Sequence, residues 1–275
     1  MIIPSEWLGL LPLYNLGFFL VAVPMMLWLN NKTKNDIPIL ILGILYMLVY
    51  GILVEPGFDD WLFFVFGLLV GYITDYIGVK TKKWKYHPWD PEFGYSYYVG
   101  FAWGMVTMFT YSVGKGVGEF VGDDPVLLII PAVVFLSPII LAEYKYGETR
   151  RDQYFLFARA LFTILAFYNN LGLLFVACFI GSFIEWAGVY WIKNWLYIDN
   201  ISFIFLSFGY SLVIITAKMI VDVLASNPIP IFVSIFYILA ALSYILDLYW
   251  TQTKVRKQYN LDQSEKALEA SKAFK

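Results

Sequence analysis

The chain is dominated by long apolar runs separated by short polar stretches, and this pattern limits the folds that it can adopt. Such runs approach the roughly 20 residues that an α-helix needs to cross about 30 Å of hydrocarbon. Of the 275 residues, 60% are hydrophobic and only 15% are charged, which is too little polar surface to cover a soluble globule of this size. We therefore predict an all-α fold, a polytopic membrane helix bundle with about nine transmembrane helices, at residues 7–30, 37–54, 60–79, 96–113, 126–143, 154–169, 171–192, 201–222 and 228–250.

The distribution of basic residues predicts the orientation of these helices. When the nine spans alternate across the membrane, nearly all of the 19 lysine and arginine residues fall on one side, and Lys115 lies in a loop on the other. By the positive-inside rule, the basic side is cytoplasmic. The sequence thus predicts a multi-pass cell-membrane protein with its N-terminus outside and its C-terminus in the cytoplasm.

The chain contains one short pattern twice. Residues 71–79 (GYITDYIGV) are echoed by residues 181–189 (GSFIEWAGV), so that Asp75 and Glu185 each lie inside an apolar run. Each acid is followed by a short basic turn and then by a Trp-x-Tyr motif, which is Trp84-Lys85-Tyr86 in the first copy and Trp195-Leu196-Tyr197 in the second. A carboxylate in hydrocarbon is costly and persists only where it faces protein, water or a substrate. The duplicated acids are therefore the first functional candidates.

The repeat extends beyond this pattern. With small changes of register, Trp103-Gly104 aligns with Phe208-Gly209, and Glu143 aligns with Asp247. The second to fifth helices thus recur as the sixth to ninth, and because four is even, both copies have the same orientation. We predict two parallel four-helix repeats plus one extra N-terminal helix. The corresponding units are the extra helix at 1–36, the repeats at 37–150 and 151–257, and a cytoplasmic tail at 258–275.

Small residues share a helix face with each acid. Steps of four, four and three residues place all members of each set on one side of a helix. Small side chains at this spacing let a neighbouring backbone approach closely. Each acid is therefore expected on the protein-facing side of its helix, within the sets Gly67, Gly71, Asp75 and Gly78, and Ala177, Gly181, Glu185 and Gly188.

Four carboxylates are expected towards the cytoplasmic end of the bundle. Asp75 and Glu185 are catalytic candidates, and Glu143 and Asp247 complete the set. We expect Asp75 and Glu185 to face a common cavity, lined by aromatic residues that bind a substrate, namely Trp84, Tyr86, Trp103, Trp195 and Tyr197. Structural roles remain open. Asp75 and Glu185 could instead have a structural role and form hydrogen bonds that hold neighbouring helices together. Glu143 and Asp247 could extend to the lipid headgroups or form an ion pair with a nearby basic side chain.

The sequence lacks the familiar metal and cofactor motifs. The sole histidine, His87, has no neighbours that would complete a metal site, and the sole cysteine, Cys178, lies in an apolar run where we expect it to pack. Residues 114–118 (GKGVG) lie in a predicted loop and indicate a flexible turn, and Lys218 and Asp222 have the spacing of an intrahelical ion pair. We therefore predict no metal, no cofactor and no nucleic-acid partner.

The tandem motif resembles a known family. An acid, a glycine, a short basic turn and Trp-x-Tyr, present at 75–86 and again at 185–197, resemble the integral-membrane lycopene cyclases of archaeal, fungal and actinobacterial type and the related carotenoid hydratase-like proteins. The resemblance implies an isoprenoid or carotenoid-like lipid substrate and a carboxylic acid that protonates it, leading to cyclisation, hydration or isomerisation. The chain departs from that family in two respects. No Pro-x-Glu-Glu follows the Trp-x-Tyr motif, and nine helices exceed the family's usual seven or so.

Two other classes of function stay open. A small proton- or cation-coupled transporter would also use intramembrane carboxylates and parallel repeats. An accessory or scaffold subunit would use the bundle only to pack against a larger membrane complex, and a homo-oligomer is a further option for the assembly. The residues do not specify the substrate, the product or the oligomeric state.

Overall fold

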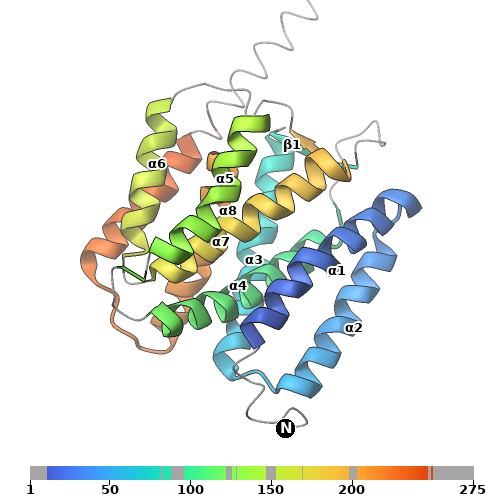
Figure 1. Cartoon of the computed structure of the whole chain (residues 1–275), viewed down its shortest axis with the longest axis horizontal. Helices are drawn as coiled ribbons and strands as arrows, with labels where there is room; N and C mark the ends of the chain where they lie inside the picture. Colours follow the sequence, from blue (N-terminus) through green and yellow to red (C-terminus); the bar gives the residue numbers. More distant parts are fainter. Residues whose placement is uncertain are drawn as a thin grey trace, which may run out of the picture.

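The computed structural model describes residues 11–81, 83–87, 96–121, 126–127, 129–146, 153–168, 170–197, 203–246 and 249, and within these it is mostly helical. Two short strands, β1 (Trp84–Tyr86) and β2 (Trp195–Tyr197), accompany the helices (Figure 1). The helices are α1 (Leu11–Thr33), α2 (Ile37–Val54), α3 (Phe58–Lys80), α4 (Val99–Val121), α5 (Ile129–Tyr146), α6 (Gln153–Ala166), α7 (Leu171–Glu185) with its π-helical extension η2 (Trp186–Trp191), α8 (Phe203–Leu224) and the C-terminal helix Ile231–Leu246.

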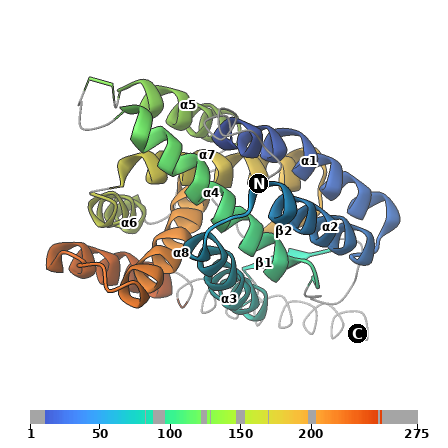
Figure 2. The same ribbon diagram turned by 90° about the horizontal axis from the view of Figure 1, so that it is seen from below.

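The helices form layers around a central pair. Helices α4 and α7 pack against each other, with α3 and α8 on one side and α1 and α5 on the other (Figure 2). Helix α2 pairs with α1, and α6 packs on α8. The four helices α3, α4, α7 and α8 therefore enclose the region into which both acid-bearing segments project.

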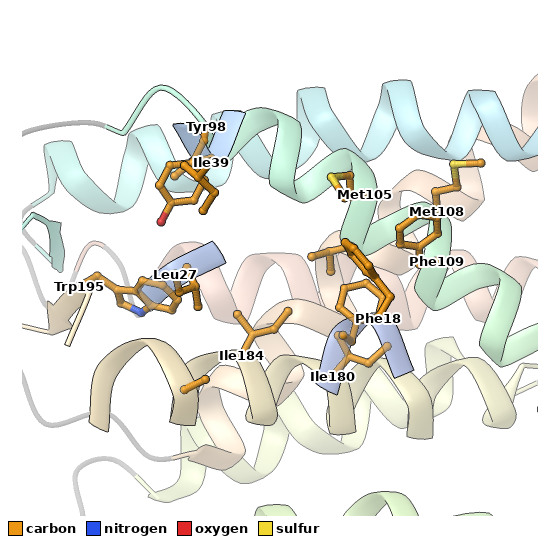
Figure 3. Packing of buried hydrophobic residues seen from close by; sticks show 14 of the residues in the cluster. Phe18, Leu27, Ile39, Tyr98, Met105, Met108, Phe109, Ile180, Ile184 and Trp195 are labelled. Carbon is orange, nitrogen blue, oxygen red and sulfur yellow. The ribbon is translucent and has the colours of Figure 1, made fainter. Parts of the chain in front are cut away.

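Aromatic packing joins α1, α2 and α4. Phe109 of α4 is fully buried, and the rings of Phe18, Phe19 and Tyr50 meet it edge-on at centroid distances of 5.5, 5.8 and 5.0 Å. Figure 3 shows Phe18, Phe109 and Ile180 of α7 gathered in the same cluster. Each edge-to-face pair contributes about 0.5–1.5 kcal/mol beyond the burial of its area. This core fixes α4, which carries one of the site residues, against α1 and α7.

The described helices have the character of membrane helices. By length and composition alone, three of them are long and apolar enough to cross a membrane, Phe58–Lys80, Leu171–Trp191 and Leu206–Leu224. Large apolar side chains are exposed on the outer surfaces of α2, α3 and α5, among them Ile52, Ile73 and Ile140, and an apolar surface of this extent suits contact with lipid. The nine crossings and the orientation stay predictions.

The helices lie close to their predicted positions, with one clear correction. The GKGVG segment, predicted as a flexible turn, is helical because α4 continues to Val121. Gly114 is buried there against Leu173 of α7, and an added Cβ would come within 2.8 Å of the Leu173 backbone. The glycine therefore permits a close approach of two helices and does not mark a turn. The predicted separation of α6 from α7 is confirmed, and Asn170 is the residue before α7.

Candidate functional site

The first acid lies on the packed face of α3, as predicted. Gly67, Gly71, Asp75 and Gly78 are all buried, whereas Ile73 on the same helix is exposed. A Cβ added to Gly71 would overlap the side chain of Trp103 on α4, and one added to Gly67 would overlap Thr107. The missing side chains thus make the room through which α4 approaches and brings Trp103 to the acid.

Three aromatic donors hold Asp75. The Trp84 indole Nε1 and the Tyr86 hydroxyl both donate to Oδ1, at 3.0 and 2.7 Å. The Trp103 indole Nε1 donates to the other oxygen, Oδ2. Asp75 is only 4% exposed, and a buried carboxylate needs such partners to offset its lost hydration.

The second acid has a matching environment on α7. Gly181 and Gly188 are buried, and added Cβ atoms there would overlap the rings of Tyr210 on α8 and Trp195 on β2. The Trp195 indole Nε1 donates to Glu185 Oε2 at 2.9 Å. The hydroxyls of Tyr197 and Tyr210 are further hydrogen-bond partners of this carboxyl group.

The two Trp-x-Tyr motifs pair with each other. β1 and β2 are antiparallel, and Trp84 lies opposite Tyr197 while Tyr86 lies opposite Trp195. The central pair is Lys85 with Leu196. Since side chains alternate along a strand, the Trp and Tyr of each motif point to one face, and this face is turned towards the acids. The strand pair therefore delivers four aromatic donors to one place.

Asp75 and Glu185 line a common cavity of about 40 Å³. The space suffices for a few water molecules. The prediction that both acids face one cavity with Tyr and Trp in its wall is confirmed, but Trp195, which was predicted to line it, is not part of this wall. Its aromatic lining consists of Trp84, Tyr86, Trp103, Tyr197, Tyr210 and Tyr244.

A larger apolar cavity lies next to the acids. It has a volume of about 90 Å³ and is bounded by α1, α2, α4, α7, α8 and the two strands. Figure 3 shows part of its wall, with Leu27, Tyr98, Ile184 and Trp195 around the same space. Tyr86, Trp103 and Tyr210 line both cavities. These three aromatic side chains are the residues common to both linings, so the two spaces adjoin at them.

Two predicted site residues are not placed at this cavity. Glu143 lies in α5, and its side chain falls outside the described part of the structure, as does the whole of Asp247. Their predicted participation stays a prediction. Two predictions of purely structural roles are confirmed. Lys218 and Asp222 form an ion pair at 2.6 Å, and Cys178 is fully buried against Ser211, with Sγ and Oγ 3.3 Å apart.

Sequence reasoning missed Tyr210 and the backbone change beside Glu185. Tyr210 belongs to no sequence motif. Its position beside Glu185 becomes evident only in the structure, where it packs against Gly181. The helix predicted at 171–192 is α-helical only to Glu185 and then π-helical from Trp186 to Trp191. Such π turns recur at functional sites, but apolar spacing does not distinguish them from an α-helix.

Sequence reasoning also missed a polar cluster around Asp36, just before α2. His87 Nε2 lies 3.1 Å from Asp36 Oδ1, so the histidine has a carboxylate partner that its neighbours in sequence do not indicate. Asp36 also accepts hydrogen bonds from Asn30 Nδ2, Ser96 Oγ and the Tyr97 amide, at 2.8, 2.7 and 2.8 Å. Burial alone would raise the pKa of Asp36, but these hydrogen bonds and the charge of His87 hold it below its ordinary value of 3.8.

Among the described residues, no group of three or more His, Cys, Asp or Glu side chains could hold a metal ion. Comparison of the chain with protein-family models, with curated proteins and with solved structures gives no match. The features that point to a function are therefore the two buried acids and the cavities beside them.

Proposed function

We propose that the protein is an integral-membrane enzyme that acts on a hydrophobic isoprenoid or carotenoid-like lipid and starts its reaction by protonating a carbon–carbon double bond. One observation carries the proposal. The two buried acids share a cavity, and three aromatic side chains of that cavity also line a larger apolar space. An acid next to an apolar, aromatic-lined space is the arrangement that protonation of an alkene requires.

The chemistry follows from these parts. A carboxyl group transfers its proton to one carbon of the double bond, and the other carbon becomes a cation. The faces of Tyr86, Trp103 and Tyr210 are positioned to stabilise that cation through their π-electrons. Attack of a second double bond on that cation closes a ring, and loss of a neighbouring proton to the carboxylate then gives a cyclised product. Loss of a proton without ring closure gives an isomerised product, and capture of water, which then gives up one of its protons, gives a hydrated one. In each case the carboxylate regains a proton, and no oxidant or reductant is consumed.

The apolar cavity favours a substrate that is bound by one end. Its volume of about 90 Å³ is small for a whole long isoprenoid, since pockets that enclose drug-sized ligands are several times larger. The residues that line this cavity, among them Phe18 and Trp103, are mainly apolar and aromatic. The cavity therefore suits a hydrocarbon group and not a charged headgroup. We therefore expect one terminal unit to enter the cavity and the remainder of the molecule to extend beyond it.

We further propose nine membrane crossings, with the N-terminus outside, the C-terminus cytoplasmic, and two parallel repeats at 37–150 and 151–257. The contacts around the acids support the repeats. α3 packs on α4 and α8, and correspondingly α7 packs on α8 and α4. Gly71 against Trp103 has its counterpart in Gly181 against Tyr210. These contacts pair Trp103 with Tyr210, two residues beyond the Phe208 of the sequence alignment.

The orientation has a simple test. A reporter fused after Lys257 is expected in the cytoplasm and one inserted between α4 and α5, after Val121, outside. Both reporters on one side would contradict the nine-span arrangement.

The enzymatic proposal is tested by expression in host cells that accumulate lycopene, followed by lipid extraction and product analysis. The wild type is expected to convert the polyene, and Asp75→Asn and Glu185→Gln are expected to abolish conversion. Asp222→Asn is the matched control, because this acid belongs to the α8 ion pair and not to the cavity. Thermal unfolding in detergent shows whether each variant is folded.

Two results would overturn the proposal. One is no conversion by the wild type, and the other is full activity of the Asp75→Asn, Glu185→Gln double variant. Proton or cation flux in proteoliposomes, without lipid conversion, would establish a transporter in its place.

A further inference from the structure

We infer that the two acids have different tasks: Asp75 is held as a carboxylate anion, and Glu185 is the group that carries the exchangeable proton. The difference follows from the donors around each acid. The step in which Glu185 passes its proton to a substrate rests on the proposed function. The protonation states themselves do not.

The donors around Asp75 favour the anion. An indole N–H can only donate a hydrogen bond and never accept one. Trp84 places such a donor on Oδ1, and Trp103 places one on Oδ2. A proton on Oδ2 would form an O–H that finds no acceptor in its partner there, the Trp103 indole, and on Oδ1 only the Tyr86 hydroxyl could accept it. The ionised carboxylate, in contrast, accepts both indole bonds and the Tyr86 hydroxyl at once, and hydrogen bonding to the charged form favours that form.

The donors around Glu185 accommodate both states. Only one of them is an indole, Trp195, and it is bonded to Oε2. The other two are the phenols of Tyr197 and Tyr210, and a phenol O–H can either donate or accept. A protonated Glu185 can therefore keep the Trp195 hydrogen bond while its own O–H donates to a tyrosine hydroxyl. No partner is left unsatisfied in either state.

The shared cavity favours a proton on one of the two acids. Two carboxylates enclosed in the same small, largely apolar space repel each other when both are ionised, so one of them retains a proton. The electrostatic interaction between Asp75 and Glu185 acts across this space. The hydrogen-bond donors around each acid determine which one holds the proton. Asp75 has two indole donors and Glu185 only one, so the proton is assigned to Glu185.

Tyr210 is placed to connect Glu185 with the apolar cavity. Its hydroxyl is a partner of Glu185, and its ring lines both cavities. The ring also lies against Trp103, with centroids 4.6 Å apart. A proton can thus leave Glu185 directly or through this phenol, whereas Asp75 remains a fixed negative charge that stabilises a cation formed nearby.

Infrared spectroscopy of the purified protein tests the assignment without any substrate. A protonated carboxylic acid has a C=O stretching band distinct from that of a carboxylate. At neutral pH we expect this band in the wild type, shifted by incorporation of glutamate carrying ¹³C in the side-chain carboxyl group but not by the equally labelled aspartate. The band is expected to disappear in Glu185→Gln. Glu119→Gln is the matched control, because Glu119 is exposed on α4.

The outcomes separate the two proposals. A band that shifts with labelled aspartate, a band that survives in Glu185→Gln, or no band at all overturns the assignment. A glutamate band that is lost in Glu185→Gln, together with no conversion of lycopene, would support the assignment and reject the enzymatic function. Conversion of lycopene together with a band that shifts with labelled aspartate would support the enzymatic function and reject the assignment of the proton to Glu185.

Discussion

The two acid sites are built from one pattern but differ in a single helix-borne partner and in the backbone beside the acid. At the first site, α3 continues as a regular α-helix to Lys80, and α4 supplies an indole, Trp103, to Asp75. At the second site, the helix becomes π-helical directly after Glu185, and α8 supplies a phenol, Tyr210. The strand residues are the same type in both. The replacement of an indole by a phenol therefore changes what a repeated acid can do.

The change from α-helix to π-helix at the second site accompanies a difference in the length of the acidic side chain. Glu185 has one methylene more than Asp75, and its carboxyl group still meets the indole of the following Trp-x-Tyr motif. In the first copy the Lys83 amide bonds to the Gly78 carbonyl at 2.8 Å, and in the second the Asn194 amide bonds to the Gly188 carbonyl at 2.6 Å. The turn is thus one residue longer in the second copy. A π turn takes up an extra residue without ending the helix.

The largest expected loss of stability comes from adding a side chain at the two glycines against which Trp103 and Tyr210 pack. Gly71→Leu and Gly181→Leu should each destabilise the protein by about 3 kcal/mol or more, because the new side chain would overlap the base of Trp103 or of Tyr210. Thermal unfolding in detergent measures the loss. Ile73→Leu is the control on α3, since Ile73 is 55% exposed. Equal tolerance of Gly71→Leu and Ile73→Leu would show that the glycine face is not packed.

A smaller effect should distinguish the indole from the phenol. Trp103→Phe removes the donor on Asp75 Oδ2 and should cost about 2 kcal/mol, because a buried charged acceptor loses its partner. Tyr210→Phe keeps the ring and should cost about 1 kcal/mol or less, while it lowers the rate of proton transfer. Unfolding and conversion rates, measured on the same preparations, provide the comparison. A greater loss of stability in Tyr210→Phe than in Trp103→Phe would contradict the distinction between the sites.

Hydropathy and spacing were sufficient to predict the helices and both acids, and the reasons are local. Apolar runs mark α3 and α7, and the small-residue spacing identifies their packed faces because each glycine lies one turn from the next. The Trp-x-Tyr motifs were found because they recur. None of these signals depends on a partner that is distant in sequence.

The remaining features depend on distant partners or on backbone geometry. Asp36 and His87 are 51 residues apart, and the sequence around neither residue indicates their contact. Tyr210 has no motif around it, and the sequence alignment selected Phe208 in its place. The π turn after Glu185 leaves the apolar pattern intact. The continuation of α4 through Gly114 was missed because glycine is common both in turns and at close helix contacts.

The smallest expected effect concerns the polar cluster around Asp36, which lies outside both acid sites. The lowered pKa of Asp36 means that its ionised form stabilises the folded protein above pH 3.8, and that this contribution is lost as the pH falls below that value. Unfolding temperatures recorded from pH 6 to pH 3 should therefore drop by a few degrees more in the wild type than in Asp36→Asn. Identical pH profiles for the two proteins would show that Asp36 is not held by the His87 and Ser96 contacts.

The central claim is that a carboxyl proton is transferred to a carbon of the substrate, and the isotope content of the product tests it most directly. Carboxyl protons exchange with solvent, so conversion of lycopene by the purified protein in D₂O should place a deuterium on carbon at each double bond that is protonated. The account predicts a product with solvent deuterium bound to carbon, formed by the wild type and absent from Glu185→Gln. A product that contains no deuterium on carbon would contradict it.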